Sequence, residues 1–524
     1  MNQAALFARN RPALCSTCAM TITEVLPDDP ATLKAMLIAE RARSERLEQI
    51  IRAFQRHRFG RHSEQLSDEQ LQFCLEDIEQ ADGARDAAEV HADPAKKAAQ
   101  ANHRRRNRGA LPAHLPRIET VVDIADRHCP HCHGEMHQIG EDVSERLDVI
   151  PAQFRVIVTR RPKYACRSCK SVVVQAPAPA HLIEGGLPTE ATVAQVLVSK
   201  YADHLPLYRQ AQVYARQGVH LDRATLADWV GRAAWLLQPV HVRLFEKLKA
   251  SGKLFADETT APVLDPGRGR TKTGQFWAYA RDDRPWGGTD PPGVAYLYAP
   301  DRKSERPQGH LAGFKGIVQV DGYAGYNALA ESGDIALAYC WAHVRRKFYE
   351  LADGGDAPIA SEMLARIAKL YAVEGDIRGK SPDVRRNIRR QKSLPMLAEL
   401  EAWLRAKLEI ISQKSKLAEH IRYTLTHWNG LTRFVEDGRI EIDNNTVERS
   451  IRPITLNRKN ALFAGSDGGA EHWAVIASLI ETCKLNGVDP LAYLTDVITK
   501  IVGGHLNSKI DELLPWACET RQPQ

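Results

Sequence analysis

Three acidic residues have the types and surroundings needed to bind divalent metal ions. Asp257 follows a strand-like segment at residues 254–256, Asp321 follows another at residues 317–320, and Glu448 lies further downstream. Converging carboxylates repel one another unless a cation lies between them, and hard oxygen ligands select Mg²⁺ or Mn²⁺ over zinc. Two such ions can assist an in-line displacement at phosphorus. The acids therefore predict a two-metal, nuclease-like site, although a single Asp at a strand end is more often a turn former.

Four cysteines form a second candidate metal site. Two C-x-x-C pairs supply the four thiolates that a tetrahedral structural Zn²⁺ needs, and these are Cys129, Cys132, Cys166 and Cys169. A neighbouring histidine could replace one thiolate, and the candidates are His128, His131 and His133. A redox C-x-x-C is the lesser alternative, because such motifs occur singly. A further pair, Cys15 and Cys18, has no evident mate and is left unassigned.

Short β-rich segments around the two aspartates follow the order of a ribonuclease-H-like sheet. The expected strands are residues 254–256, 276–280, 294–298, 317–320 and 335–339. In this order the first and fourth strands are neighbours, so the carboxylates of Asp257 and Asp321 would converge. Asp443 is a natural N-cap for a later helix that carries Glu448. Glu448 could then face the aspartates, while Arg449 and Arg452 meet DNA phosphate.

The chain between the second and third acids is longer than a compact sheet of this kind needs. Three stretches in it are helical in pattern, namely residues 364–372, 396–407 and 417–428. Residues 378–392 are interpreted as a basic connector between helices. We expect a helical insertion over about 350–430 that covers DNA or contacts a second protomer. A solvated hairpin without DNA contact is the alternative.

Two N-terminal segments have patterns typical of partner or DNA binding. Between residues 33 and 54, a stripe with alternating spacings of four and three predicts a zipper-like helix, or else a surface helix. Residues 96–117 contain no acid, so this linker either touches phosphate or is simply solvated. Its candidate DNA contacts are Arg104, Arg105, Arg106 and Arg108.

Residues 187–248 are interpreted as helices with a possible DNA-reading layout. A helix at residues 208–216, a turn at Gly218 and a second helix at residues 223–233 resemble a helix-turn-helix, a layout shared by many ordinary helical hairpins. Its candidate phosphate contacts are Arg209, Arg216, Arg223 and Arg232.

The composition limits the class of protein but does not identify its partner. The 524 residues suggest roughly three or four domains, and 44% hydrophobic with 26% charged residues is ordinary for globular proteins. No apolar run approaches the roughly 20 residues that span a bilayer, and no secretory leader is evident. We therefore expect a cytoplasmic protein with no membrane partner. The net charge of +6 is uninformative, because it averages basic and acidic stretches.

Several stretches in combination resemble the large transposase of the insertion sequence 66 family. They are residues 59–66 (FGRHSEQL), 255–259 (FADET), 320–323 (VDGY), 340–348 (CWAHVRRKF) and the run from Asp443-Asn444-Asn445 to Arg452-Pro453. The resemblance covers nearly the whole chain, in the family's order. We therefore expect a multidomain α+β protein with an irregular leader (1–30), a zipper-like helical region (31–78), a basic linker (79–118), a zinc ribbon (119–175), a helical DNA-contact segment (187–248), a ribonuclease-H-like DDE catalytic domain (250–475) and a C-terminal helical segment (476–524).

The resemblance also assigns roles to particular residues. Asp257, Asp321 and Glu448 match the three acidic positions of the family's catalytic triad. His343 matches a motif position whose role stays unassigned, between a supporting catalytic residue and a packed histidine. The leader that contains the first cysteine pair has no place in the family's pattern, so translation could start at Met20.

The leading hypothesis is a DNA transposase. It would bind the ends of its own mobile element, hydrolyse a phosphodiester at each end, and use the freed 3′ hydroxyl to attack target DNA. Its partners would be DNA, at least one further copy of the chain and, as the resemblance implies, small accessory proteins; in a bacterial cytoplasm it would associate with the nucleoid when bound to DNA. The rivals are a ribonuclease-H-like nuclease or resolvase without strand transfer, and a non-catalytic zinc-containing DNA-binding regulator.

Overall fold

The computed structural model describes the larger part of the chain after residue 152. The described residues are 153–165 and 173–518 except 266–269, 332 and 356, with scattered earlier positions at 29, 30, 34, 37, 116–119, 121, 128, 131–135 and 137. The chain forms two compact units, Met1–Pro151 and Ala152–Gln524, which are described separately. The predicted zipper-like helix, apart from single positions, lies outside the described residues. So do Arg104, Arg105, Arg106 and Arg108 of the basic linker.

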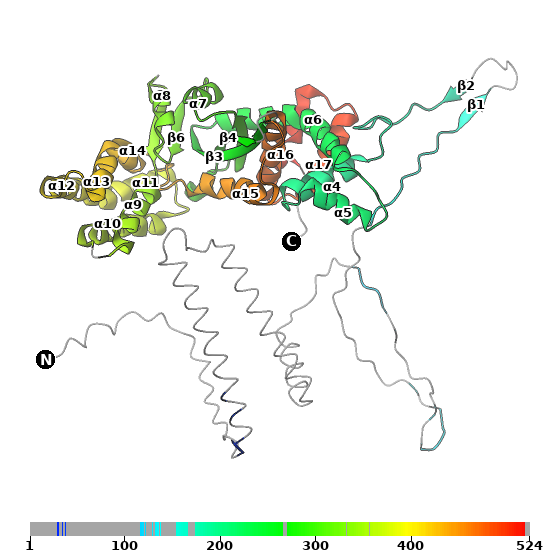
Figure 1. Ribbon diagram of the computed structural model, residues 1–524, viewed down its shortest axis with the longest axis horizontal. Coiled ribbons are helices and arrows are strands. Elements are labelled where there is room, and N and C mark those ends of the chain that lie inside the picture. The colour runs from blue at the N-terminus through cyan, green and yellow to red at the C-terminus, as the bar shows by residue number, and fades with distance from the viewer. Residues whose placement is uncertain are drawn as a thin grey trace. The chain divides into compact units, whose positions relative to one another are not determined.

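A five-stranded mixed sheet lies at the centre of the second unit, with strand order β5-β4-β3-β6-β7 (Figure 1). Its strands are β3 (Lys253–Asp265), β4 (Arg270–Arg281), β5 (Gly293–Ala299), β6 (Gly316–Val320) and β7 (Ile335–Tyr339). β4 pairs antiparallel with β3 and β5, whereas β6 runs parallel to β3 and to β7. Each predicted strand lies within one of these, and the prediction that the first and fourth are neighbours is confirmed.

β3 is longer than the sequence predicts, and this changes the setting of Asp257. The strand continues past this residue because its ladder with β4 extends to the pair Asp265↔Arg270. The pairing with β6, in contrast, ends at Phe255↔Gln319. Asp257 therefore lies inside a strand rather than at its end, two residues beyond the last pair with β6.

Helices that precede the strands in the chain and helices that follow them share one hydrophobic core with the sheet. They are α4 (Glu190–Tyr201), α6 (Arg223–Lys249), α16 (Asp467–Leu485) and α17 (Pro490–Val502). α16 also satisfies the edge strand β5, since Ser478 Oγ accepts a hydrogen bond from the Tyr296 amide (2.8 Å) and Thr482 Oγ1 accepts one from the Val294 amide (3.1 Å). α4 and α6, which belong to the expected helical segment 187–248, pack in the same core as the sheet, and the expected boundary between residues 475 and 476 lies within the span of α16.

A second hydrophobic core belongs to the helices that follow β7. They are α9 (Trp341–Asp353), α10 (Pro358–Ile377), α12 (Leu394–Ile410), α13 (Lys416–Thr426) and α14 (Trp428–Thr432), and the short α11 (Pro382–Ile388) lies between α10 and α12 in the chain. This core contains Phe348, Ile367, Leu400 and Ile421, and it reaches the sheet at Ala338 of β7. The predicted helices at 364–372, 396–407 and 417–428 are present, so the insertion is a packed helical body with its own core.

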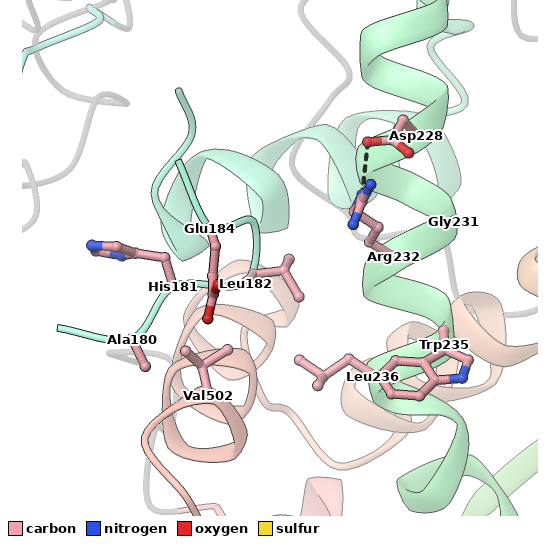
Figure 2. A pocket seen from close by; sticks show the side chains of 10 residues that line it. All are labelled: Ala180, His181, Leu182, Glu184, Asp228, Gly231, Arg232, Trp235, Leu236 and Val502. Carbon is pink, nitrogen blue, oxygen red and sulfur yellow. Dashed lines mark hydrogen bonds and ion pairs between the residues drawn. The ribbon is translucent and has the colours of Figure 1, made fainter. Parts of the chain in front are cut away.

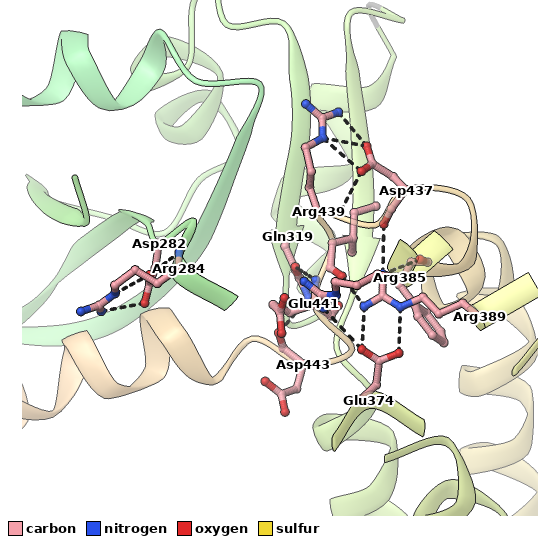
Figure 3. A network of polar contacts seen from close by, with 12 residues as sticks. Asp282, Arg284, Gln319, Glu374, Arg385, Arg389, Asp437, Arg439, Glu441 and Asp443 are labelled. Carbon is pink, nitrogen blue, oxygen red and sulfur yellow. Dashed lines mark hydrogen bonds and ion pairs between the residues drawn. The ribbon is translucent and has the colours of Figure 1, made fainter. Parts of the chain in front are cut away.

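The predicted basic connector at 378–392 is wrong. It contains α11 and a π-helical turn, Arg389–Ser393, and two of its arginines are buried, with 1% of Arg385 and 0% of Arg389 exposed. Both guanidinium groups face carboxylates, and Figure 3 shows that of Arg389 opposite Glu374. The charges of Arg385 and Arg389 are therefore paired inside the insertion instead of being solvated.

The remaining elements are short or lie near the ends of the described chain. They are β1 (Lys163–Ala165), β2 (Val173–Gln175), α5 (Leu207–Ala215), α7 (Glu305–His310), α8 (Asn327–Ala330), α15 (Asn445–Ala461) and the 3₁₀ turns Arg284–Trp286, Ala324–Tyr326, Arg433–Val435, Asn507–Leu513 and Pro515–Ala517. Among the described residues, no helix combines the length and the apolar character needed to cross a membrane.

Candidate active site

Asp257 and Asp321 occupy equivalent places on neighbouring parallel strands. The last pair between β3 and β6 is Phe255↔Gln319, and each aspartate lies two residues beyond its member of that pair. Both carboxylates are oriented by nearby amides, since Asp257 Oδ1 accepts from the Glu258 N–H (2.8 Å) and Asp321 Oδ1 accepts from the Tyr323 N–H (2.8 Å). Both side chains remain partly exposed. The two carboxylates predicted from the sequence therefore lie side by side just beyond the point where the pairing of β3 with β6 ends. This place is called the sheet edge below.

The electrostatics of Asp257 show that several acids lie close to it. Burial and the charges of Asp321, Glu258 and Glu448 together raise its pKa to about 8, although the hydrogen bond from the Glu258 amide lowers it. A carboxyl group with such a pKa marks a place where negative charge is crowded and incompletely compensated. A divalent cation at this position would remove the conflict.

Glu448 reaches this edge because the chain before α15 is tied to the sheet. On β6, Gln319 Nε2 donates to the carbonyl oxygens of Glu441 (2.7 Å) and Asp443 (2.8 Å). Asn444 Nδ2 donates to the carbonyl oxygen of Ala256 on β3 (3.1 Å). α15 therefore starts beside the two strands that carry the aspartates, with Glu448 in its first turn.

The predicted N-cap of α15 is off by one residue. The N-cap is Asn444, whereas the Asp443 carboxylate accepts a hydrogen bond from the Asn445 N–H (3.2 Å) in the turn that precedes the helix. The physical reason is that Asn444 is fully buried and anchored to β3, so its position sets where the helix begins.

His343 and Cys340 adjoin Glu448. His343 Nδ1, on α9, lies 3.7 Å from Glu448 Oε1, and Cys340, His343 and Glu448 each place one ligand atom within 4.8 Å of the others. Cys340 is buried, and its Sγ accepts a hydrogen bond from the Asn444 N–H (3.2 Å). Burial raises the pKa of the Cys340 thiol to about 12, so the thiol favours a packed, neutral state. Sequence reasoning gave Cys340 no role, although its C-x-x-H spacing from His343 was a usable signal.

Glu258 and Arg302 are two further charged residues that sequence reasoning missed. The Glu258 side chain is only 2% exposed; Oε1 accepts from Arg302 Nε (2.9 Å) and Oε2 accepts from the Tyr326 hydroxyl (2.8 Å). Successive strand residues point to opposite faces, so Glu258 needs partners of its own. The adjacent acids Asp257-Glu258 were the available signal; the partner Arg302, 44 positions away, was not visible in the sequence.

The candidate DNA contacts on helices are exposed. Arg449 and Arg452 lie on the surface of α15, the helix that also carries Glu448. Arg209, Arg216 and Arg223 are exposed at the ends of α5 and α6, on either side of a turn in which Gly218 has a φ of 78°. All of these guanidinium groups are available to an anionic ligand.

The second helix of the helix-turn-helix-like layout is longer than predicted. α6 continues to Lys249, because its later residues pack on the sheet core. Arg232 pairs with Asp228 on the same helix (2.8 Å), and both line a pocket with His181 and the 77% exposed Trp235 (Figure 2).

Of the four predicted zinc ligands, Cys132 lies among the described residues. Cys132 is exposed in a turn bracketed by an antiparallel bridge between His128 and Glu135. β1 and β2 pair antiparallel, and residues 166–172 connect them. Cys129, Cys166 and Cys169 lie outside the described residues, so their joint coordination stays a prediction.

Comparison with known proteins finds models of one family that match most of the chain. The sequence model described as "Transposase IS66 family" matches residues 185–472, and the zinc-finger binding domain of the IS66 transposase matches residues 126–170, which include all four predicted zinc ligands. The IS66 C-terminal element matches residues 478–516, and the model "Transposase C of IS166 homeodomain" matches residues 46–120.

Two proteins of Sinorhizobium fredii (strain NBRC 101917 / NGR234) are similar over nearly their full length. The uncharacterized protein y4qI is 45% identical over 94% of this chain and 97% of its own, and the uncharacterized protein y4jD is 43% identical over the same shares. The chain belongs to the IS66 family of transposases, which implies that it binds DNA.

Proposed function

We propose that this chain is a DDE-type transposase whose catalytic carboxylates are Asp257, Asp321 and Glu448. The observation that carries the proposal is the crowding of acids at one sheet edge, where burial, Asp321, Glu258 and Glu448 raise the pKa of Asp257 to about 8. The strand order β5-β4-β3-β6-β7 supports a ribonuclease-H-like sheet, in which this edge is the active site. His343, 3.7 Å from Glu448, is proposed as a positioning residue for that carboxylate.

The donor set fits Mg²⁺ or Mn²⁺, with two ions expected. Three carboxylates supply hard oxygen ligands, and the crowding that raises the pKa of Asp257 is what a bound cation relieves. When bound, such ions supply charge neutralisation at the phosphate and a more acidic attacking water. The zinc-finger match similarly supports a structural Zn²⁺ held by Cys129, Cys132, Cys166 and Cys169.

The reaction requires two in-line displacements at phosphorus. In the first, a water oxygen attacks a phosphodiester at an element end, and the 3′ oxygen of the element leaves with a proton. In the second, that 3′ hydroxyl attacks a phosphodiester of target DNA, and a target 3′ oxygen leaves. Arg449 and Arg452, exposed on the helix that carries Glu448, are proposed to bind DNA phosphate close to the reacting bond. The same duplex would be bound at a greater distance from the reacting bond by Arg209, Arg216 and Arg223.

The proposal is tested with Asp257→Asn on a duplex that carries an element end, in Mn²⁺. We expect cleavage to fall about a thousandfold or more, because a metal ligand supplies several kcal/mol and each ~1.4 kcal/mol is tenfold in rate. Asp203→Asn, at an exposed turn residue after α4, is the matched control and should cleave at the wild-type rate. Unchanged cleavage by Asp257→Asn would show that the reaction uses another site.

A separate target plasmid in the same assay distinguishes the rivals. Joined element-target products indicate transposition, whereas cleavage without joining indicates a nuclease or resolvase. Binding without metal-dependent nicking would indicate a DNA-binding regulator. Light scattering on DNA tests the proposed assembly of at least two copies, and co-purification tests the proposed accessory proteins.

A further inference from the structure

We propose that Arg302 binds a phosphate of the DNA strand that lies at the acidic cluster, and that Glu258 and Tyr323 hold its guanidinium group in place for this contact. The inference rests on the proposed function and adds a substrate contact to it. Arg302 lies in the loop between β5 and α7, outside every basic stretch that was predicted to contact DNA.

The guanidinium group of Arg302 is fixed on two sides. Its Nε donates to Glu258 Oε1 at 2.9 Å, and its Nη2 donates to the same oxygen. Its plane lies over the Tyr323 ring, with Cζ 3.7 Å from the ring centroid. The Tyr323 hydroxyl donates in turn to the Arg302 carbonyl oxygen (2.7 Å), so the Tyr323 side chain contacts both the guanidinium group and the backbone of Arg302. An arginine held in this way loses little conformational entropy when it binds a further anion.

The same anchors connect Arg302 to the acidic cluster. Glu258 follows Asp257 on β3, and the Tyr323 N–H is the group that orients Asp321 Oδ1 (2.8 Å). Each anchor is therefore the chain neighbour, or the hydrogen-bond partner, of one proposed metal ligand. Arg302 also lies close enough to Asp321 for their charges to interact, so a DNA strand whose phosphate reaches Asp321 would pass beside this guanidinium group.

Arg302 also keeps hydrogen-bonding capacity for a ligand. A guanidinium group has five N–H bonds, and both Nε and Nη2 donate to a single carboxylate oxygen, Oε1 of Glu258. The side chain is 47% exposed, whereas that of Glu258 is 2% exposed, so the open side of the pair is the cationic one. Phosphate oxygens are the acceptors that match a planar guanidinium fork.

The competing explanation is that Arg302 only neutralises the buried Glu258 carboxylate. The two explanations differ for the double variant Glu258→Gln/Arg302→Gln, in which the buried charge and its counterion are removed together. If neutralisation were the whole role, the double variant would bind DNA as the wild type does. If Arg302 binds phosphate, the double variant stays as defective as Arg302→Gln.

The experiment measures binding of the full chain to an element-end duplex over a series of salt concentrations, without cleavage. For Arg302→Gln and for the double variant we expect roughly tenfold weaker binding and a salt slope reduced by about one ion. Glu258→Gln keeps the cation and should lose less. Arg243→Gln, at a comparably paired surface arginine of α6, is the control and should keep the slope.

Recovery of wild-type affinity and slope in the double variant would overturn the inference, and so would an unchanged slope in both variants. Thermal denaturation of each variant checks the fold, and the double variant keeps the test valid if Arg302→Gln alone does not fold. Because binding is read without cleavage, the outcome is independent of whether Asp257→Asn abolishes catalysis.

Discussion

The chain has two clusters of buried or partly buried acids, one in the helical insertion and one where the pairing of β3 with β6 ends, and their charges are compensated in different ways. In the insertion, Glu374 faces Arg389, with Nε to Oε1 at 2.8 Å and Nη2 to Oε2 at 2.6 Å, and Arg385 Nη2 lies 2.7 Å from Glu441 Oε1 (Figure 3). At the sheet edge, Asp257 and Asp321 adjoin Glu448. Among the described residues, the basic side chain within 4 Å of any of these three carboxylates is His343.

The difference separates a structural cluster from a binding one. Buried carboxylates are costly unless their charge is matched, and in the insertion the protein supplies the matching cations itself. Arg389 also donates to the carbonyl oxygens of Phe434 and Ile440, so it fixes the chain that returns to the sheet. At the sheet edge the chain leaves the charge unmatched, which favours a cation taken from solution.

The two clusters are joined through Glu441. Its side chain pairs with Arg385, while its backbone carbonyl accepts from Gln319 on β6, just before the segment that leads to Glu448. The structural cluster therefore helps to set the position of the third carboxylate in the binding cluster.

The largest expected effect comes from breaking the compensated cluster. Arg389→Met removes the cation opposite Glu374 and leaves that carboxylate, whose side chain is 9% exposed, without its main partner. Loss of one member of a buried pair costs about 3–5 kcal/mol in free energy of unfolding, measured by urea denaturation. Arg390→Met is the matched control, because Arg390 pairs with Glu436 at the surface and should cost less than about 1 kcal/mol. Equal losses would mean that burial does not set the value of these pairs.

A smaller effect is expected when a metal ion binds the three carboxylates at the sheet edge. Mg²⁺ that binds the folded protein should stabilise it by about 2.7 kcal/mol at a hundredfold excess over Kd, because the unfolded chain has no such site. Thermal denaturation across a Mg²⁺ titration measures this shift, and Asp257→Asn should remove most of it. Asp203→Asn should retain it. A shift of the same size in both variants would place the binding elsewhere.

Much of the sheet could be predicted because its signals are local. The segments around Asp257 and Asp321 are short, β-rich and correctly ordered, and their neighbouring strands follow from that order. The C-x-x-C spacing likewise led to the region that the family's zinc-finger model matches. The catalytic roles of the three acids stay predictions, although the geometry is consistent with them.

The errors arose where tertiary contacts override local pattern. The basic run at 378–392 is typical of a solvated linker, but Arg385 and Arg389 are buried because acids distant in sequence, Glu374 and Glu441, meet them. Asn444 displaces Asp443 as the N-cap because a carbonyl on β3 anchors it. No sequence spacing connects Glu258 with Arg302, since the loop after β5 brings them together only in the fold.

The smallest expected effect concerns a buried cation without a closely matched acid. Lys253, at the start of β3, is 3% exposed; its Nζ donates to the carbonyl oxygen of Arg439 (2.7 Å) and lies 4.1 Å from the Phe255 ring centroid. Burial lowers its pKa to about 8, even though the charges of Glu441 and Asp283 act to raise it. Lys253 therefore shows how burial lowers the pKa of a cation whose close partner is a carbonyl oxygen, whereas the close partner of Arg389 is a carboxylate.

The sign of the pH dependence follows from that lowered pKa. Between about pH 8 and the ordinary lysine pKa of 10.5, the unfolded chain holds the proton while the folded chain has lost it, so the free energy of unfolding rises with pH. Urea denaturation at about pH 8 and pH 9.5 should show a gain of about 1–2 kcal/mol in the wild type. Lys253→Met should abolish the gain, whereas Lys315→Met, at a 73% exposed position, should keep it. If Lys253→Met kept the gain, the carbonyl and the ring would be stabilising the ammonium as well as a carboxylate does, and pairing with an acid would not be what distinguishes the two clusters.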